Sequence, residues 1–326
     1  MLEMESDTFD RLDLQLLSAL EVDARASFSR IASVLGVSDQ TIARRYRRLC
    51  AQGGLRVVAM RDSYLLGMDQ WMLRIRCAPD SAAAIAEALA RRPDTYWIGL
   101  ASGGTEVLCL TRPRTPGEHE ELLLGKLPRT PSVVEIRAHQ LLHRFYGGAE
   151  GWLRKLAVLT DEQIAALRPA ADPAPGPARI EPGDEPLLAV LERDGRASYP
   201  ELQRATGRSE SSVKRRLAAL RASGAVYIDV EYQPEILGHP VVAALWITAT
   251  PAALHSVGEA LAAHAETAWV SATAGPSNLV VTAIARSTAG LYAYLSGPLG
   301  QLEGVQHVET TPFLRRVKQL TYPVPR

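Results

Sequence analysis

The sequence of 326 residues lacks the features of a secreted, membrane or metal-binding protein. Cys50, Cys77 and Cys109 have neither CxxC spacing nor histidine partners, so neither a disulfide scaffold nor a zinc site is expected. No apolar run reaches the roughly 18 residues of a membrane-spanning helix. The polar start from 1 to 10 has no apolar core of a signal peptide. We therefore expect a cytoplasmic chain with no membrane partner, no metal and no cofactor.

Sequence signatures of common enzyme classes are missing as well. There is no phosphate-binding glycine-rich loop, no GxSxG elbow and no HExxH motif. His139 and His143 are four residues apart and would meet only if the expected strand at 133–141 ended in a helix, and they have no fitting acidic or thiol neighbours. We expect no catalytic residues and no enzyme activity.

Charge is balanced over the whole chain, with 36 Lys and Arg against 36 Asp and Glu, but it is unevenly distributed. Between positions 25 and 56, Asp39 is the only acid among a group of arginines. These are Arg25, Arg30, Arg44, Arg45, Arg47, Arg48 and Arg56. A locally basic face binds nucleic acid through release of counterions, and the neutral total does not cancel it.

The chain is an internal duplication. Residues 36–49 and 207–220 align without a gap, each as a short helix, a turn and an arginine-rich amphipathic helix. Leu66-Gly67 matches Leu237-Gly238 at the same offset, and after a one-residue insertion Trp97 matches Trp269. Each copy is about 140 residues long, so tandem domains are expected rather than a solenoid, whose units have about 20 to 50 residues.

Each copy is expected to begin with a three-helix head and to continue as a βαββαβ module, which gives an α+β fold class. Ser38 and Ser209 are good N-caps for the third helices, and the period changes to that of strands after them. The expected segments are a first head at 1–56, a first module at 57–158, a short helix with a Pro/Ala-rich linker at 159–183, a second head at 184–226 and a second module at 227–326.

Within the modules, the apolar pattern predicts strands and helices in a ferredoxin-like order. In the first copy the strands are 71–77, 96–101, 106–111 and 133–141, and the helices 81–91 and 117–127. In the second copy the strands are 241–248, 268–273, 279–285 and 305–313, and the helices 252–264 and 288–299. This order gives an antiparallel four-stranded sheet with both helices on one face. The bare face needs cover, and an identical sheet is the obvious candidate.

A helix-turn-helix head, a connecting strand and a βαββαβ module in this order resemble the Lrp/AsnC family of transcription regulators. Residues 23–27 and 193–198 resemble the family's acidic-Gly-Arg-small-Ser turn, and the Leu-Gly pairs match as well. The resemblance implies a fused pseudo-dimer that binds double-stranded DNA. It also implies self-association through the modules and a small-molecule effector, for which an amino acid or related metabolite is one candidate.

The third helix of each head should enter the major groove with its solvent face. With Ile42, Tyr46 and Leu49 inward, Arg44 points outward and aligns with Arg215, and both are expected to contact base edges. Gln40 suits adenine, and the other cations suit phosphates. The expected DNA-binding residues are Gln40, Thr41, Arg44, Arg45, Arg47, Arg48, Ser211, Ser212, Lys214, Arg215 and Arg216. The alternative is a solvated basic surface.

The two heads are unequal, because Arg47 and Arg48 correspond to Ala218 and Ala219. We expect the second head to hold phosphate less strongly and the target site to be asymmetric.

In relatives, effectors bind around a Gly-Asp-x-Asp turn between the second and third strands. Here the turns are 103–106 and 275–278, where only the leading glycine is kept in both copies. Loss of the acidic pair weakens the case for an amino acid, so the ligand stays open. The candidate effector contacts are Ser102, Gly103, Thr105, Glu106, Gly275, Ser277 and Asn278. The alternative is two ordinary tight turns.

A rival reading is the siroheme decarboxylases, which resemble the same duplicated architecture. Their modules carry a His-Asn-Tyr run and a further histidine before the third strand. This chain has 97–100 and 269–272 at those places, with no histidine between Asp94 and His119 or between His264 and His307. A decarboxylase site is therefore difficult to assemble.

Overall fold

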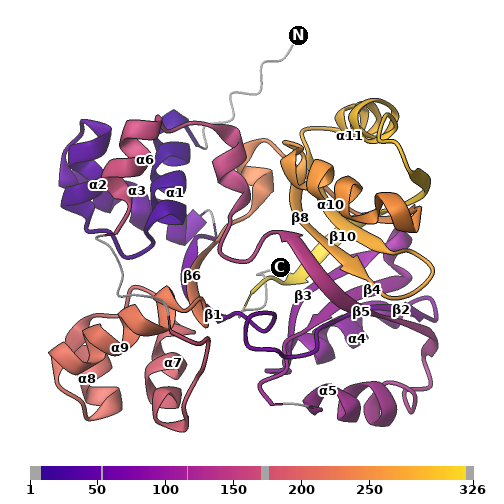
Figure 1. The fold of residues 1–326 in the computed structure, drawn as a ribbon, viewed down its shortest axis with the longest axis horizontal. Helices are drawn as coiled ribbons and strands as arrows, with labels where there is room; N and C mark the ends of the chain where they lie inside the picture. Colours follow the sequence, from indigo (N-terminus) through magenta and orange to yellow (C-terminus); the bar gives the residue numbers. More distant parts are fainter. Residues whose placement is uncertain (1–8, 53, 116, 170–175, 321–326) are drawn as a thin grey trace. The chain divides into compact units, whose positions relative to one another are not determined.

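The computed structural model describes residues 9–52, 54–115, 117–169 and 176–320. The chain folds into two compact units (Figure 1). The head unit comprises Met1–Met60 and Gly148–Pro240, and the sheet unit comprises Arg61–Gly147 and Val241–Arg326. The chain thus groups head with head and module with module, although the sequence order alternates them. Within the described ranges, no helix has both the length and the apolar character needed to cross a membrane.

Each head is a bundle of three helices. The first contains α1 (Arg11–Val22), α2 (Phe28–Leu35) and α3 (Asp39–Gln52), and the second α7 (Glu185–Leu191), α8 (Tyr199–Thr206) and α9 (Glu210–Ala222). The expected N-caps are confirmed: the Ser38 hydroxyl accepts from the amide of Thr41 at 3.1 Å, and the Ser209 hydroxyl accepts from that of Ser212 at 3.3 Å. These caps set where the helices that follow the turns begin.

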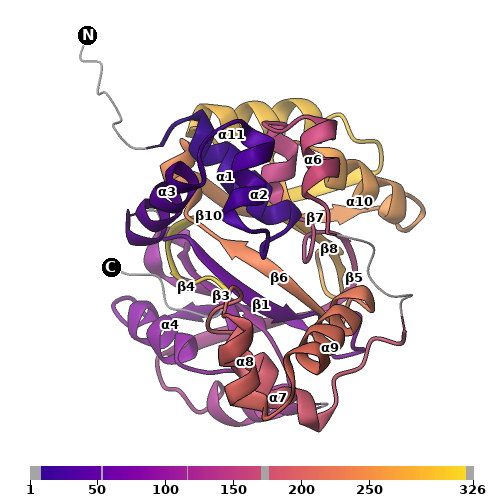
Figure 2. The same cartoon turned by 90° about the vertical axis from the view of Figure 1, so that its left-hand side faces the viewer.

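The two heads share one small sheet. Strand β1 (Arg56–Arg61) pairs with β6 (Val226–Glu231), and both lie between the two sets of helices (Figure 2). The expected short helix of the linker is α6 (Asp161–Leu167), and the side chain of Leu167 is fully buried. The expected linker also spans 170–175, which lie outside the described residues.

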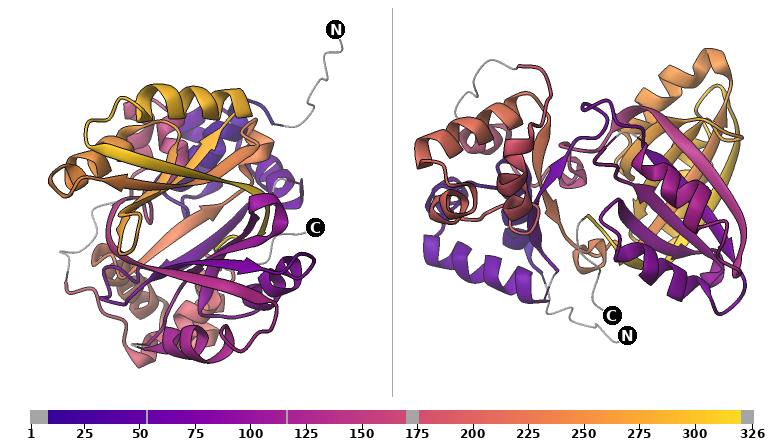
Figure 3. Two further views of the ribbon diagram at one scale, coloured as in Figure 1. Left: turned by 90° about the vertical axis from the view of Figure 1, so that its right-hand side faces the viewer. Right: turned by 90° about the horizontal axis from the view of Figure 1, so that it is seen from below.

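The sheet unit is one closed sheet of eight strands (Figure 3). The first module contributes β2 (Trp71–Cys77), α4 (Ala82–Ala90), β3 (Thr95–Ala101), β4 (Glu106–Thr111), α5 (Glu118–Glu120) and β5 (Val133–Tyr146). The second contributes β7 (Val241–Ala249), α10 (Leu254–Ala263), β8 (Thr267–Thr273), β9 (Leu279–Ala285), α11 (Thr288–Tyr294) and β10 (Val305–Lys318). The strand order is β10-β3-β4-β2-β5-β8-β9-β7, with β7 closing onto β10.

The two modules are joined by strands that run beyond their expected ends. Residues 141–146 of β5 pair antiparallel with β8, and residues 313–318 of β10 pair antiparallel with β3. The inner faces of both modules then enclose a shared apolar cluster that includes Met72, Leu108, Trp246 and Val280. An identical sheet does cover each bare face, as expected, but the cover comes with edge pairing and not by stacking alone.

The second helix of each module ends differently from expectation. After α5 and α11 the chain continues as π-helical turns at Glu121–Lys126 and Leu295–Leu299. Gly125 and Pro298 lie inside these turns. Glycine is a poor helix former and proline lacks the amide donor, so both disfavour a regular α-helical ladder there.

Candidate nucleic-acid interface and effector cavity

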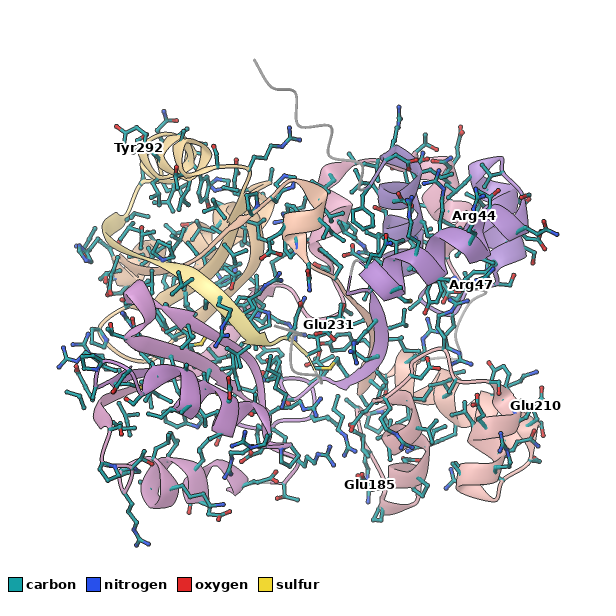
Figure 4. All side chains as sticks on the ribbon, turned by 180° about the vertical axis from the view of Figure 1, so that it is seen from behind. Arg44, Arg47, Glu185, Glu210, Glu231 and Tyr292 are labelled. Atoms are coloured by element: carbon teal, nitrogen blue, oxygen red, sulfur yellow. The ribbon has the colours of Figure 1, made fainter. Side chains whose placement is uncertain are left out.

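Helix α3 presents a polar solvent face. Gln40, Arg44 and Arg47 are exposed, whereas Ile42 and Leu49 on the opposite face are fully buried. Figure 4 labels Arg44 and Arg47 along this helix. The Nε of Arg47 donates to the carbonyl of its own helix at Ala43, 3.2 Å away. Thr41 is half-buried, and its hydroxyl lies 2.9 Å from that of Ser38, so it belongs to the helix cap.

Helix α9 presents a weaker version of the same face. Ser211, Lys214 and Arg215 are exposed, and Ser212 is half-buried. The ammonium of Lys214 lies 2.6 Å from the carboxylate of Glu210 one turn earlier. Arg215 therefore supplies the exposed cation that corresponds to Arg44.

Three of the arginines expected to bind phosphate have partners inside the heads. Arg45 contacts the carboxylates of Asp10 at 2.7 Å and Asp13 at 3.0 Å, and Arg48 pairs with Asp13 too. In the second head, Arg216 pairs with Asp184.

The carboxylates of Asp13 and Asp184 are fully buried, and each lies at the start of the first helix of its head. Burial alone raises the pKa of Asp184, but the hydrogen bonds from Arg216 and the Glu181 amide, together with the charges of Arg216 and Arg208, lower it overall. These ion pairs tie the third helix to the first. The role of Arg45, Arg48 and Arg216 as phosphate contacts stays a prediction, and their first role is structural.

Tyr46 is less buried than Ile42 and Leu49, the other residues of the expected apolar stripe. Its ring is half-buried, and its centroid lies 5.2 Å from that of Phe28. The guanidinium of Arg196 from the second head lies over the Tyr46 ring at 5.5 Å. Tyr46 therefore contacts the second head.

The first effector turn is built around Glu106. The hydroxyl of Ser102 donates to the Glu106 carboxylate at 2.7 Å, and the hydroxyl of Thr105 donates to the carbonyl of Ser102 at 2.9 Å. Ser102 and Gly103 have φ of 51° and 67°, in the left-handed region. Only glycine adopts this region without cost, so Ser102 is a strained residue at the turn.

Glu106 belongs to a network of charges that lines a cavity of about 220 Å³. Arg74 donates to Glu106 at 2.6 Å and to Glu309 of the second module at 2.6 and 2.9 Å. Burial alone lowers the pKa of Arg74, but the hydrogen bonds to Glu309 and Glu106, together with the charges of these two carboxylates, raise it overall. The lining residues are Arg74, Arg76, Ser102, Thr105, Glu106, Glu135, Arg137 and Glu309. Ser102, Thr105 and Glu106 thus meet in one cavity.

The second effector turn is closed by its own hydrogen bonds. The amide group of Asn278 bonds both backbone groups of Ala249, at 2.9 Å to the N–H and 2.8 Å to the carbonyl. The carbonyl of Ser277 accepts from the hydroxyl of Thr273 at 2.8 Å. A Cβ atom on Gly275 would lie 2.8 Å from the ring of His139. The three candidates of this turn do not line the cavity, so the structure does not bring the two sets together.

Sequence reasoning missed most of the cavity, because its residues come from separate strands. The alternation of Arg74 and Arg76 in an otherwise apolar strand is the sequence signal that points to it, and the structure places Glu106 opposite Arg76 in the register. Glu309 reaches the cavity from the other module and has no local signal. In the second module, Trp246 occupies the position that corresponds to Arg74.

His139 is buried beside the cavity and not in its lining. Its ring stacks on Trp246 at 4.8 Å between centroids, and its Nδ1 lies 3.2 Å from the carbonyl of Ala274. Burial lowers the pKa of His139 below the usual value. The described residues that line the cavity include no histidine.

Comparisons with known proteins match each half of the chain. A model of the AsnC-type helix-turn-helix domain matches residues 9–49 and 183–221, and a model of the Lrp/AsnC ligand binding domain matches residues 242–323. An HTH-type transcriptional regulator of Pyrococcus furiosus is 29% identical over 38% of this chain and 85% of its own. The HTH-type transcriptional regulator FL11 of the same organism is 27% identical over 42% of this chain and 91% of its own.

A likeness to a solved structure extends over nearly the whole chain. The siroheme decarboxylase NirDL aligns with a TM-score of 0.64 at 12% identity, over 96% of this chain and 94% of that chain. The single-copy relatives therefore match about one repeat, and the duplicated arrangement has a precedent in a protein of different sequence. At this identity the likeness concerns the fold alone.

Proposed function

We propose that this chain, which belongs to the Lrp/AsnC family, is a sequence-specific DNA-binding transcription regulator in which one polypeptide supplies both reading heads. The observation that carries the proposal is the pair Arg44 and Arg215. They occupy matching positions on the third helices of two helix-turn-helix domains, and both are exposed. A guanidinium that projects from such a helix matches the O6 and N7 atoms of guanine in the major groove.

The remaining exposed groups suit supporting roles. Gln40 on α3 and Ser211 on α9 occupy matching positions at the start of the helices, where base edges come closest. Arg47 and Lys214 suit phosphates, which position the heads without reading sequence. The buried ion pairs of Asp13 and Asp184 orient the third helices relative to the rest of each head.

Selection of duplexes from a random pool by the full chain tests this proposal. We expect an enriched site, bound with an affinity that falls steeply as salt rises. The double variant Arg44→Ala and Arg215→Ala should lose the enrichment. Arg91→Ala, which removes an exposed arginine of the sheet unit, should keep it. No binding of any duplex by the wild-type chain at low salt would refute the proposal.

The cavity around Glu106 is our candidate effector site, and it supports one site per chain. The lining holds three arginines and three glutamates, so it is charge-balanced before any ligand enters. An anion alone would have to separate an arginine from its carboxylate and leave that carboxylate unpaired. A small ligand that carries both an ammonium and a carboxylate fits this balance. The matching turn of the second module is closed by Asn278.

Thermal shifts of the full chain with each of the common amino acids test the effector site. A ligand that raises the melting temperature of the wild type should lose this effect in Glu106→Gln, which keeps the size of the side chain. Asn278→Asp, at the matching position of the second copy, is the control and should keep the effect. Equal loss in both variants would argue against the cavity.

The second candidate function is a siroheme decarboxylase-like enzyme, which the whole-chain likeness to NirDL favours. Against it stands the lining of the cavity, whose described residues include no histidine for an acid or an iron ligand. Titration of the chain with iron uroporphyrin distinguishes the two functions. We expect no saturable change of the porphyrin absorbance, and a saturable change with release of carbon dioxide would favour the enzyme.

Self-association is part of the proposal. The two modules of one chain already form one closed sheet, which is the pairing that relatives are expected to achieve between chains. Further assembly would then use surfaces outside this sheet, and the mass of the protein in solution measures it.

A further inference from the structure

Two arginines hold the heads together in a reciprocal arrangement. The guanidinium of Arg25 donates to the carbonyls of Gly195 at 2.6 Å and Ala197 at 2.9 Å. The guanidinium of Arg196 donates to the carbonyls of Ala24 at 2.5 Å and Ala26 at 2.9 Å. Donors and acceptors are at matching positions of the two copies. We call Arg25 and Arg196 together the arginine clasp.

Each arginine of the clasp also packs on an aromatic ring of the opposite head. Arg25 lies over Tyr199 at 5.1 Å from the ring centroid, and Arg196 lies over Phe28 at 4.9 Å. Phe28 and Tyr199 are the first residues of α2 and α8. Planar guanidinium groups both stack on rings and donate along fixed directions, so the two contacts restrict rotation as well as separation.

The loop that carries Arg196 also contacts the two-stranded sheet. The amide of Gly195 donates to the carbonyl of Val57 in β1 at 2.7 Å. A Cβ atom on Gly195 would lie 2.8 Å from the Ile228 side chain in β6 and 3.1 Å from the Val57 backbone. The loop therefore lies directly against the two-stranded sheet, and it has no room to shift toward that sheet.

We propose that Arg25 and Arg196 are positioning residues that fix the distance and angle between α3 and α9, so that the chain accepts a single half-site spacing on DNA. The inference rests on the proposed function, because only a DNA reader has half-sites. The clasp joins the residues that lead into α2 and α8, and each of these helices is followed by a three-residue turn and the reading helix. A paired helix-turn-helix protein reads spacing as geometry.

The clasp also changes how the basic stretch of the first head is understood. Arg25 belongs to the cluster of arginines between 25 and 56, yet its guanidinium is bound to carbonyls of the second head. An arginine held in this way is not presented to phosphate. The contribution of Arg25 to DNA binding is therefore through geometry, and a lysine that keeps the charge should not replace it.

The first experiment measures the distance between the heads without DNA. Spin labels go onto Ser33→Cys in α2 and Arg204→Cys in α8, matching exposed positions, in a Cys50→Ser background because Cys50 is exposed. We expect a narrow distance distribution, and a broad one after Arg25→Lys with Arg196→Lys. The control is Arg30→Lys, since Arg30 donates to the Ala166 and Arg168 carbonyls of the segment that covers its own head. Equal far-UV circular dichroism establishes that the variants are folded.

The second experiment uses the site selected by the wild-type chain, with five base pairs inserted at its centre. Half a helical turn rotates one half-site away, so wild-type affinity should fall by at least about tenfold. The double lysine variant should fall by less than about threefold, because its heads adjust independently. The Arg30→Lys control should behave as the wild type.

The two experiments separate failure of the inference from failure of the proposed function. A broad distance distribution in the wild type overturns the clasp whatever the DNA result. Equal wild-type affinity for the parent and the lengthened site also overturns it. If the wild type binds no duplex at all, the proposed function fails, and the distance measurement alone then decides whether the clasp holds the heads.

Discussion

The two heads differ where they face solvent, but they share the ion pairs inside each head and the arginine contacts of the clasp. The ion pair of Asp13 with Arg45 in the first head is matched by that of Asp184 with Arg216 in the second, and the clasp is reciprocal. On the outward faces, by contrast, Arg47 is matched by an alanine. Contacts that hold the fold impose the same chemistry on both copies, whereas contact with a partner does not. The unequal outward faces support the proposal of a DNA site whose two halves differ. The shared contacts support a symmetric arrangement of the two heads.

The two modules follow the same rule with a larger divergence. Arg74 in the first module binds Glu106 and Glu309, and its counterpart Trp246 is fully buried in the second. Arg74 lies over the Trp246 ring at 4.7 Å, so one copy supplies the cation and the other the ring. Because a single chain contributes both modules, these two positions were free to become different. A dimer of identical chains does not have that freedom.

The largest expected effect concerns the two positions at the centre of the sheet unit. Trp246→Ala should lower the free energy of unfolding by about 3–5 kcal/mol, because a fully buried indole leaves a cavity. Arg74→Ala should cost about 1–3 kcal/mol, the cost of leaving Glu106 without its cation. Urea denaturation followed by near-UV circular dichroism gives both values. A larger loss of stability for Arg74→Ala than for Trp246→Ala would contradict the conclusion that the Trp246 ring fills the core while Arg74 supplies only the charge.

The next effect compares two glutamates at matching positions, Glu21 in α1 and Glu192 after α7. Burial, together with the nearby Asp229 carboxylate, raises the pKa of Glu21 from 4.5 to about 8. Asp229 lies in β6, and the matching position in β1 is Val58. The folded head unit therefore holds an extra proton between these two pH values, and its stability falls as pH rises from about 4.5 to about 8.

We expect the wild-type head unit to lose at most about 4–5 kcal/mol of stability over this range, at about 1.4 kcal/mol for each pH unit. Glu21→Gln should remove the dependence above about pH 6, because an amide does not titrate. The part below about pH 6 should stay, because burial also raises the pKa of Asp229 from 3.8 to about 6. Glu192→Gln is the matched control and should leave the whole dependence in place. Thermal unfolding at pH 5, 6, 7 and 8 measures the slope, and an equal slope in Glu21→Gln and the wild type would show that another group causes it.

A smaller effect separates the two reading arginines. Arg44→Ala and Arg215→Ala should each weaken binding to the selected site by about 1–3 kcal/mol and relax the base preference at one position, a different one for each head. Repeating the duplex selection with each variant identifies the two positions. If both variants relaxed the same position, or neither did, the heads would not read separate half-sites.

Much of the fold was predictable from the sequence, because its signals are local. The strands at 71–77, 106–111 and 279–285 have the expected bounds, since each is a short apolar run between turn signals. The ends of β5 and β10 were missed. They carry exposed Leu142 and Leu314, and they pair with strands of the other module. Pairing between distant segments leaves no periodic signal in the strand itself.

The candidate site divides in the same way. The helical period was enough to place Arg44 and Arg215 outward, because the buried stripe fixes the opposite face. It was not enough for Arg45 and Arg48, whose buried partner Asp13 lies on another helix. The cavity needs strands from both modules, so only Ser102, Thr105 and Glu106, which share one turn, were found together.

The smallest expected effect tests whether an internal partner keeps an arginine from DNA. Arg47→Ala should reduce the slope of log affinity against log salt by about 0.9, the value for one lost phosphate contact. Arg45→Ala should leave that slope nearly unchanged, because the guanidinium of Arg45 is already bound to Asp10 and Asp13. Binding to a random duplex between 50 and 200 mM salt, about the range in which the effect is steep, measures both slopes. Lys214→Ala in the second head should give an intermediate value, since the Lys214 ammonium is exposed but paired with Glu210. Equal slopes for the Arg47 and Arg45 variants would mean that the internal ion pairs open on DNA.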